Sequence, residues 1–289
     1  MLRSVGGISG ELLPADGEPV VGSVRLPAGA RVPAYGTDEP AAWVTVRPVP
    51  DAGRVWLALS GITARTGLQP LLQVGPEGWE PGDDFIEPTD ITGLDDADAA
   101  DLLARGWGDG TLDSDPEEYA LYGAQYGFEY SSWDDDPEWV ARFAPYGEVF
   151  PGLAPATSGQ VPEAEIGRAV DLMGPAHVCL VQASRPADVL PLIGWHPTDL
   201  FQTALPVAAI LRSWEGRFGA RLLRIGPGAE LRLLVERPPR TMQEATPVAA
   251  ELLALSGTWV NPENGHSLRS ISEIAPCLVD NPLSGFWWD

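Results

Sequence analysis

Residues 177–183 of this 289-residue chain read HVCLVQA, an uninterrupted apolar run of strand length. Such a run is typical of a strand that is covered on both faces. Helical patterns follow over residues 185–195 and 203–219, the second with Thr203 as a possible cap. Residues 220–237 then predict two strands joined by a Pro-Gly turn. The region is therefore expected to alternate strands and helices around one sheet.

Two more helices are expected after this hairpin. Thr241 and Glu244 have the spacing of a capping box. Pro247 lies inside the apolar run that follows, so either the helix is kinked there or it begins at Thr246. For the last helix, Ser267 is the expected cap.

The chain ends in FWWD, residues 286–289, although chain ends usually fray. A short last strand added to the sheet would turn Phe286 and Trp288 to one face and Trp287 to the other. The alternative is that Trp287 or Trp288 is an exposed anchor for a partner, because tryptophan is enriched in interface hot spots.

The N-terminal part predicts mostly strands and turns. Residues 41–49 and 54–61 are short apolar alternations bounded by Pro and Gly, and residues 63–75 predict a short helix or turn followed by a strand. One helix is expected within residues 95–107, where aspartates crowd the first turn. Residues 109–159 predict an irregular segment that wraps around the body of the protein.

These patterns together predict an α+β fold, in which a C-terminal mixed sheet with helices packed on it is preceded by a β-rich N-terminal part and an acidic irregular linker. The expected division is a β-rich domain over residues 1–108, a linker with aromatic residues over 109–160, and an α+β domain over 161–289.

Charge is distributed unevenly along the chain. The formal net charge is −23, and between Glu80 and Glu138 there are nineteen carboxylates against Arg105 alone. A field of this sign repels phosphate backbones and anionic lipids, so neither nucleic acid nor a membrane is an expected partner, whereas a basic protein is. The alternative is that the segment is a solvated linker that keeps the protein soluble.

Enzyme signatures are scarce in the sequence. It contains no nucleophile elbow, phosphate loop, dinucleotide fingerprint or helical pair of metal-binding histidines. Asp109, Asp113 and Asp115 imitate a calcium loop that lacks its glycine and its last glutamate, so no metal or cofactor is expected. Cys179 and Cys277 are interpreted as small buried residues in a reducing compartment.

No signal-peptide pattern opens the chain and no apolar run approaches about 18 residues, so we expect a cytoplasmic protein. For a docking role, the candidate residues lie in the acidic segment, on the helix of residues 203–219 and at the terminus. They are Asp134, Asp135, Asp136, Arg212, Glu215, Arg217 and Trp287. Core packing for Trp214 and local charge pairing for the helix residues are the alternatives to recognition.

Several motifs resemble a known family. LRSWEGRFGARLL at 211–223, RPADVLPLIGW at 185–195, NPEN at 261–264 and the terminal FWWD resemble the bacterial family called domain of unknown function 4253. TGLQPLL, EPGDDF and PYGEVFPGLAPA in the N-terminal half are similar to its longer members. Residues 259–264 lack the cysteine expected there, which argues against a cysteine-based activity at that place. The resemblance implies no established activity.

Two functions from different classes follow. The first is a non-enzymatic binding protein, such as an acidic immunity-type or regulatory protein, that docks a basic protein partner by charge complementarity. The second is an enzyme with an unrecognised site in a cleft between the two halves. His196, Asp199 and Glu215 could line one cleft, and the alternative is that they are solvated polar residues at helix ends.

Overall fold

The structure is a computed structural model that describes residues 10–73, 85, 87–107, 137–196, 204–226, 230–257, 259–262 and 265–288. The strands are β1 (Val20–Val21), β2 (Val24–Arg25), β3 (Gly29–Pro33), β4 (Pro40–Thr45), β5 (Leu68–Gln73), β6 (His177–Gln182), β7 (Ala220–Gly226), β8 (Glu230–Val235), β9 (Trp259–Val260), β10 (Ser267–Leu268) and β11 (Leu283–Trp287). The α-helices are α1 (Ala52–Ser60), α2 (Thr63–Thr66), α3 (Ala99–Arg105), α5 (Pro137–Arg142), α6 (Glu163–Asp171), α7 (Val189–Ile193), α8 (Ala204–Phe218), α9 (Met242–Ser256) and α10 (Ile271–Leu278). Three short 3-10 helices are η1 (Gly10–Leu12), η2 (Leu94–Asp96) and η3 (Pro186–Asp188).

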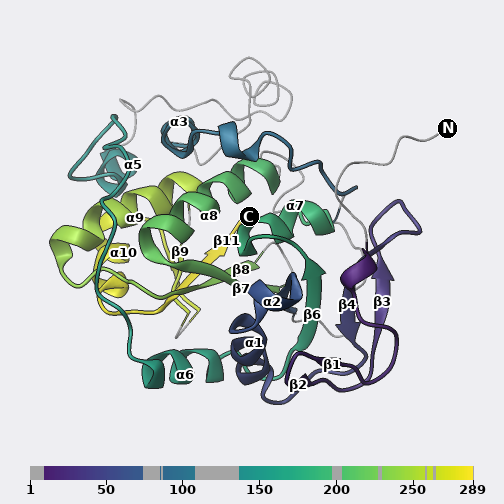
Figure 1. Ribbon diagram of the computed structural model, residues 1–289. Helices are drawn as coiled ribbons and strands as arrows, with labels where there is room; N and C mark the ends of the chain where they lie inside the picture. Colours follow the sequence, from purple (N-terminus) through teal and green to yellow (C-terminus); the bar gives the residue numbers. More distant parts are fainter. Residues whose placement is uncertain are drawn as a thin grey trace.

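Nine of these strands form one mixed sheet in the order β10-β9-β11-β8-β7-β5-β6-β4-β3 (Figure 1). Neighbouring strands are antiparallel except β5 and β7, which are parallel. Because β5 lies between β6 and β7, strands from both sides of the predicted boundaries share hydrogen bonds in one sheet. The division of the chain into domains stays a prediction.

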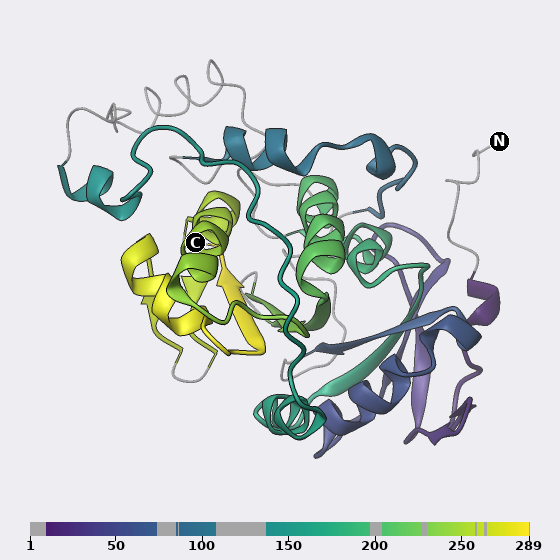
Figure 2. The same cartoon turned by 60° about the vertical axis from the view of Figure 1, so that its left-hand side comes forward.

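Each face of the sheet carries its own core. Alternate residues of β6 point to opposite faces, so that Cys179 and Val181 pack with α7 and α8 while Val178 and Leu180 pack with α1. Figure 2 shows α8 and α9 on one side of the sheet and α1 and α6 on the other. The predicted α+β fold is confirmed, and β6 is a strand covered on both faces.

The elements around β6 also follow the sequence. Strands β7 and β8 pair as the predicted hairpin, with Leu222 opposite Leu233. The helix α9 begins at the predicted cap, where the Thr241 side chain accepts a hydrogen bond from the Glu244 amide. It continues through Pro247 and does not begin at Thr246. The predicted cap Thr203 of α8 lies outside the described residues.

The terminal residues form β11, which lies inside the sheet between β9 and β8. The alternation is as predicted: Phe286 and Trp288 are buried, whereas Trp287 is 41% exposed. The Phe286 ring stacks on Trp214 of α8 at 5.7 Å and on Trp288 at 5.9 Å. Burial of these rings explains why the chain can end in aromatic residues without fraying.

One predicted strand is wrong. Residues 54–60 lie in α1, with Gly61 as its C-cap, and this helix packs on β5 through Trp56 and Leu59. Buried residues at 52, 56 and 59 have the spacing of one helix face, which the short apolar run obscured.

The predicted cap of the last helix is wrong as well. Ser267 belongs to β10 and is paired with Val260 of β9. The cap of α10 is Ser270, whose hydroxyl oxygen accepts a hydrogen bond from the Glu273 amide. Ser270 and Glu273 have the capping-box spacing, and this pair sets the start of the helix.

Candidate functional site

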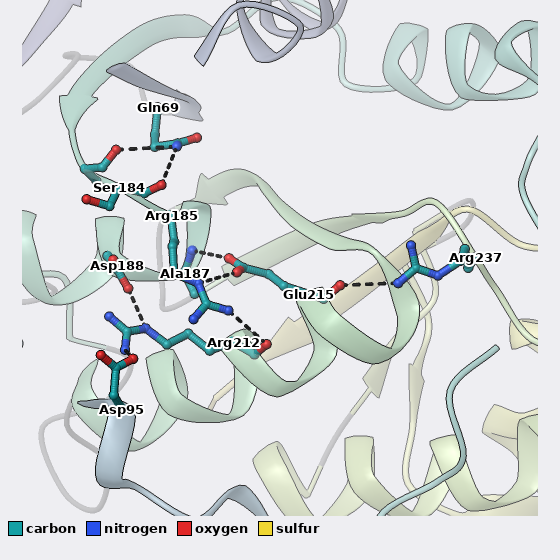
Figure 3. Close-up of polar contacts among 10 residues, drawn as sticks. Gln69, Asp95, Ser184, Arg185, Ala187, Asp188, Arg212, Glu215 and Arg237 are labelled. Carbon is teal, nitrogen blue, oxygen red and sulfur yellow. Dashed lines mark hydrogen bonds and ion pairs between the residues drawn. The ribbon is translucent and has the colours of Figure 1, made fainter. Parts of the chain in front are cut away.

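A cluster of charged side chains lies along the outer surface of α8 (Figure 3). Arg212 and Glu215 come from α8 itself, Arg185 and Asp188 from the segment that links β6 to α7, and Asp95 from η2. We call these five residues the charged cluster. The linking segment is anchored to the sheet by the buried Gln69, whose side-chain amide donates to the carbonyl of Ala183 at 3.4 Å.

Arg212 joins two carboxylates. Its Nε donates to Asp188 at 2.7 Å and its Nη1 donates to Asp95 at 2.6 Å. The Asp188 side chain is 2% exposed, and that of Asp95 is 88% exposed. Arg212 therefore connects the buried base of the charged cluster to the surface, with its own charge balanced from both sides.

Glu215 is the second acceptor on α8. It accepts hydrogen bonds from the Ala187 amide at 2.8 Å and from Arg185 Nε at 2.9 Å. Burial nevertheless raises the pKa of Glu215, because the loss of hydration outweighs these two bonds and the charge of Arg185. The carboxyl group thus keeps its proton to a higher pH than it would in the unfolded chain.

This raised pKa predicts a pH effect on stability. Between the unfolded pKa of about 4.3 and the higher folded pKa, the folded state binds more protons, so the contribution of Glu215 to stability falls as the pH rises. Glu215→Gln removes this titration. We expect the difference in unfolding free energy, wild type minus variant, to be largest near pH 4 and to shrink as the pH rises. Denaturant unfolding at a series of pH values measures it, and a difference that grows with pH would contradict the account.

Arg217 points instead into a buried network. Its guanidinium donates to both carboxylate oxygens of Glu251, each at 2.6 Å, and Glu251 is fully buried. The same carboxylate accepts hydrogen bonds from Trp214 Nε1 at 2.7 Å and from the Ala154 amide at 2.5 Å. Arg217 is thus held inside the protein and does not present its charge to a partner.

A surface hollow of about 500 Å³ opens beside the charged cluster. Arg185, Arg212, Ala209 and Ser213 line one side, Leu153 another, and residues 94–99 the third. Asp95, Asp96 and Asp98 on that third side are exposed. Arg212 pairs with both Asp188 and Asp95, and Arg185 pairs with Glu215. Two guanidinium groups thus face five carboxylates, so the hollow carries an excess of negative charge.

Of the other predicted site residues, those that the structure describes lie apart from this cluster. Asp134, Asp135 and Asp136 lie outside the described residues, as do the calcium-like loop and Asp199. Phe286 packs against α8 on one face of the sheet, and Trp287 lies on the opposite face. Glu215 forms hydrogen bonds with Arg185 and with the Ala187 amide. The predicted cleft lined by Glu215, His196 and Asp199 stays a prediction.

Four important residues were missed by the sequence reasoning: Asp95, Arg185, Asp188 and Glu251. Two of them could have been identified from their sequence context. Asp188 and Glu251 are single acidic residues within apolar stretches, and a buried carboxylate in such a place needs a cationic partner. Those partners, Arg212 and Arg217, were both among the candidates.

The described part of the chain holds neither a cluster of metal ligands nor a helix that could span a membrane. Within it, no group of three His, Cys, Asp or Glu side chains could hold a metal ion. Nor does any helix there have the length and apolar character needed to cross a membrane. Cys179 is buried as predicted, whereas Cys277 is partly exposed.

The sheet and its helices define an α+β protein with a charged surface cluster on α8. Residues 177–289, which contain α8 and all later elements, match the family model described as Domain of unknown function (DUF4253). The match confirms the resemblance over residues 177–289, whereas the N-terminal motifs TGLQPLL, EPGDDF and PYGEVFPGLAPA lie outside the matched part. Neither the curated proteins nor the solved structures give a significant match to the chain. Residues 94–99 of the hollow lie outside the matched part.

Proposed function

We propose that this protein is a binding protein that docks a basic group of a protein partner, an arginine or lysine side chain, in the hollow beside α8. The observation that carries the proposal is the charge balance. The two arginines of the hollow are outnumbered by five carboxylates, because Arg212 pairs with both Asp188 and Asp95, Arg185 pairs with Glu215, and Asp96 and Asp98 add two further negative charges that attract a cation. Carboxylates placed around a guanidinium give its strongest hydrogen bonds.

The chain as a whole supports the same kind of partner. Its net charge is −23, and residues 94–99 of the hollow belong to the acidic stretch between Glu80 and Glu138. Such a field steers a basic partner towards the site and increases the association rate. An acidic protein of this kind fits a regulatory or immunity-type role in the cytoplasm, where the unpaired Cys179 and Cys277 stay reduced.

A catalytic role is less well supported. The carboxylates of the charged cluster already accept hydrogen bonds from protein donors: Asp95 and Asp188 from Arg212, and Glu215 from Arg185 and Ala187. A general acid or base must instead face a substrate. We therefore propose docking in place of catalysis.

A charge-matched pair of variants tests this function. Asp95, Asp96 and Asp98 are changed together to asparagine, which keeps the cap of α3 because asparagine is as good an N-cap as aspartate. Binding of a short arginine-rich peptide amide is then measured by calorimetry. We expect affinity to fall about 10- to 150-fold, since each of the three exposed charges contributes about 0.5–1 kcal/mol.

The control removes the same charge elsewhere, with Asp38→Asn, Glu39→Gln and Asp51→Asn at three exposed positions. It should bind the peptide almost as the wild type does. In the wild type, binding should weaken between about 0.1 M and 1 M salt, where the screening length falls from about 10 Å to about 3 Å. Equal losses in both triple variants would show a general charge effect and contradict docking in the hollow.

A further inference from the structure

Residues 150–162, which we call the strap, form an extended segment that crosses α8 and α9 (Figure 2). The strap has no helix or strand, and it buries only Ala154, Thr157 and Val161. Its sequence, FPGLAPATSGQVP, contains three prolines and no charged residue. Buried positions three or four apart are typical of an extended proline-containing peptide that lies on a surface.

The first attachment is at Ala154. Its amide donates to Glu251 Oε1 at 2.5 Å, and its carbonyl accepts from Arg217 Nη1 at 2.9 Å. One peptide unit of the strap is therefore held by both members of a buried ion pair. Ala154 itself is 2% exposed, which leaves room only for a small side chain.

The second attachment follows at Thr157 and beyond. The Thr157 amide donates to the Arg217 carbonyl at 3.2 Å, and its hydroxyl donates to the Arg237 carbonyl. Further along, the Val161 amide donates to the carbonyl of Glu236 at 2.9 Å, and Arg240 donates to the carbonyl of Gln160 at 2.8 Å. Backbone hydrogen bonds with small side chains in pockets are how proteins commonly bind extended peptides.

Every one of these partners lies within residues 177–289, whereas the strap lies outside that family domain. We propose that the family domain carries a peptide-binding groove, that the strap occupies this groove in cis, and that an extended proline-containing peptide of a partner takes its place when the strap is displaced. The peptide carries small side chains at the positions of Ala154 and Thr157. The groove is lined by Arg217, Glu236, Arg237, Arg240 and Glu251.

The experiment displaces the strap and offers a peptide in its place. Ala154→Glu adds bulk and a negative charge next to Glu251, and Ala156→Glu makes the same change at an exposed strap position. The probe is a synthetic peptide of residues 150–162. We expect folded Ala154→Glu protein to bind it at least about 10-fold more tightly than the wild type, in which the tethered strap competes at an effective concentration of the order of millimolar.

The Ala156→Glu protein should bind the peptide as weakly as the wild type does. Binding that is no tighter to folded Ala154→Glu than to Ala156→Glu would overturn the proposal. Because the peptide has no charged side chain and is made with both termini blocked, its binding should also be insensitive to salt. A failure of this test is therefore separate from a failure of cation docking in the hollow.

A second measurement covers the case in which Ala154→Glu does not fold. Amide hydrogen exchange of the wild type should show Ala154, Thr157 and Val161 exchanging together, by a local opening of lower free energy than that of the amides in β7 and β8. Exchange of the strap only with global unfolding would make it part of the cooperative core and overturn the proposal.

Discussion

Replacing Glu251 with glutamine is expected to lower the free energy of unfolding by about 3–5 kcal/mol. The carboxylate is fully buried and accepts four hydrogen bonds, from Ala154, Trp214 and twice from Arg217. A glutamine side chain has only one acceptor oxygen. Its NH2 group would take the place of the other carboxylate oxygen and would face hydrogen-bond donors. The charge of Arg217, which is 16% exposed, would lose its buried partner.

Denaturant unfolding measures this loss, and Glu165→Gln provides the control. Glu165 pairs with Arg168 at 3.6 Å on the surface of α6, where such a pair contributes little, so we expect a change below about 0.5 kcal/mol. A loss at Glu251 as small as that at Glu165 would mean that the buried network does not hold α8, α9 and the strap together.

The second large effect concerns two neighbouring aromatic residues. Phe286→Ala is expected to cost about 3–5 kcal/mol, because the ring is fully buried and stacks between Trp214 and Trp288. Trp287→Ala should cost less than about 1 kcal/mol, because this ring points away from that core and is 41% exposed. Thermal melting of both variants compares the two sides of one strand.

Similar losses at both positions would contradict the assignment of β11 as an interior strand with one buried row of rings. Deletion of residues 286–289 should be more severe than either substitution, since β11 pairs with both β8 and β9. If the Trp287 ring is a partner anchor, Trp287→Ala should weaken partner binding while the melting temperature hardly changes.

Much of the fold was readable from the sequence because local signals and packing agree. The apolar run of β6, the β7–β8 hairpin and the Thr241 cap each have a local signature. The helix α1 did not, because a nine-residue amphipathic helix and a short strand have similar apolar content. The position of β5 between β6 and β7 depends on contacts far apart in the chain, which no local pattern encodes.

The candidate site was only partly predictable for a similar reason. The sequence identified Arg212, Glu215 and Arg217 as charged residues on one helix, but not their partners. Asp188 and Glu251 lie 24 and 34 residues away from the arginines they bind, so the fold alone brings them together. This pairing makes Arg217 a structural residue, whereas Asp95, which also pairs with Arg212, together with Asp96 and Asp98 gives the hollow its excess negative charge.

The most direct test of the account is an amide chemical-shift titration of the isotope-labelled protein with arginine amide, at about 0.1 M salt. We predict saturable shifts for the amides of Leu94, Asp95, Asp96, Ala97, Asp98 and Ser213, which surround the hollow, and no saturable shift for Thr37, Asp38 and Glu39, which form an acidic surface elsewhere. Shifts of equal size in both groups, or none around the hollow, would contradict the docking of a basic group beside α8.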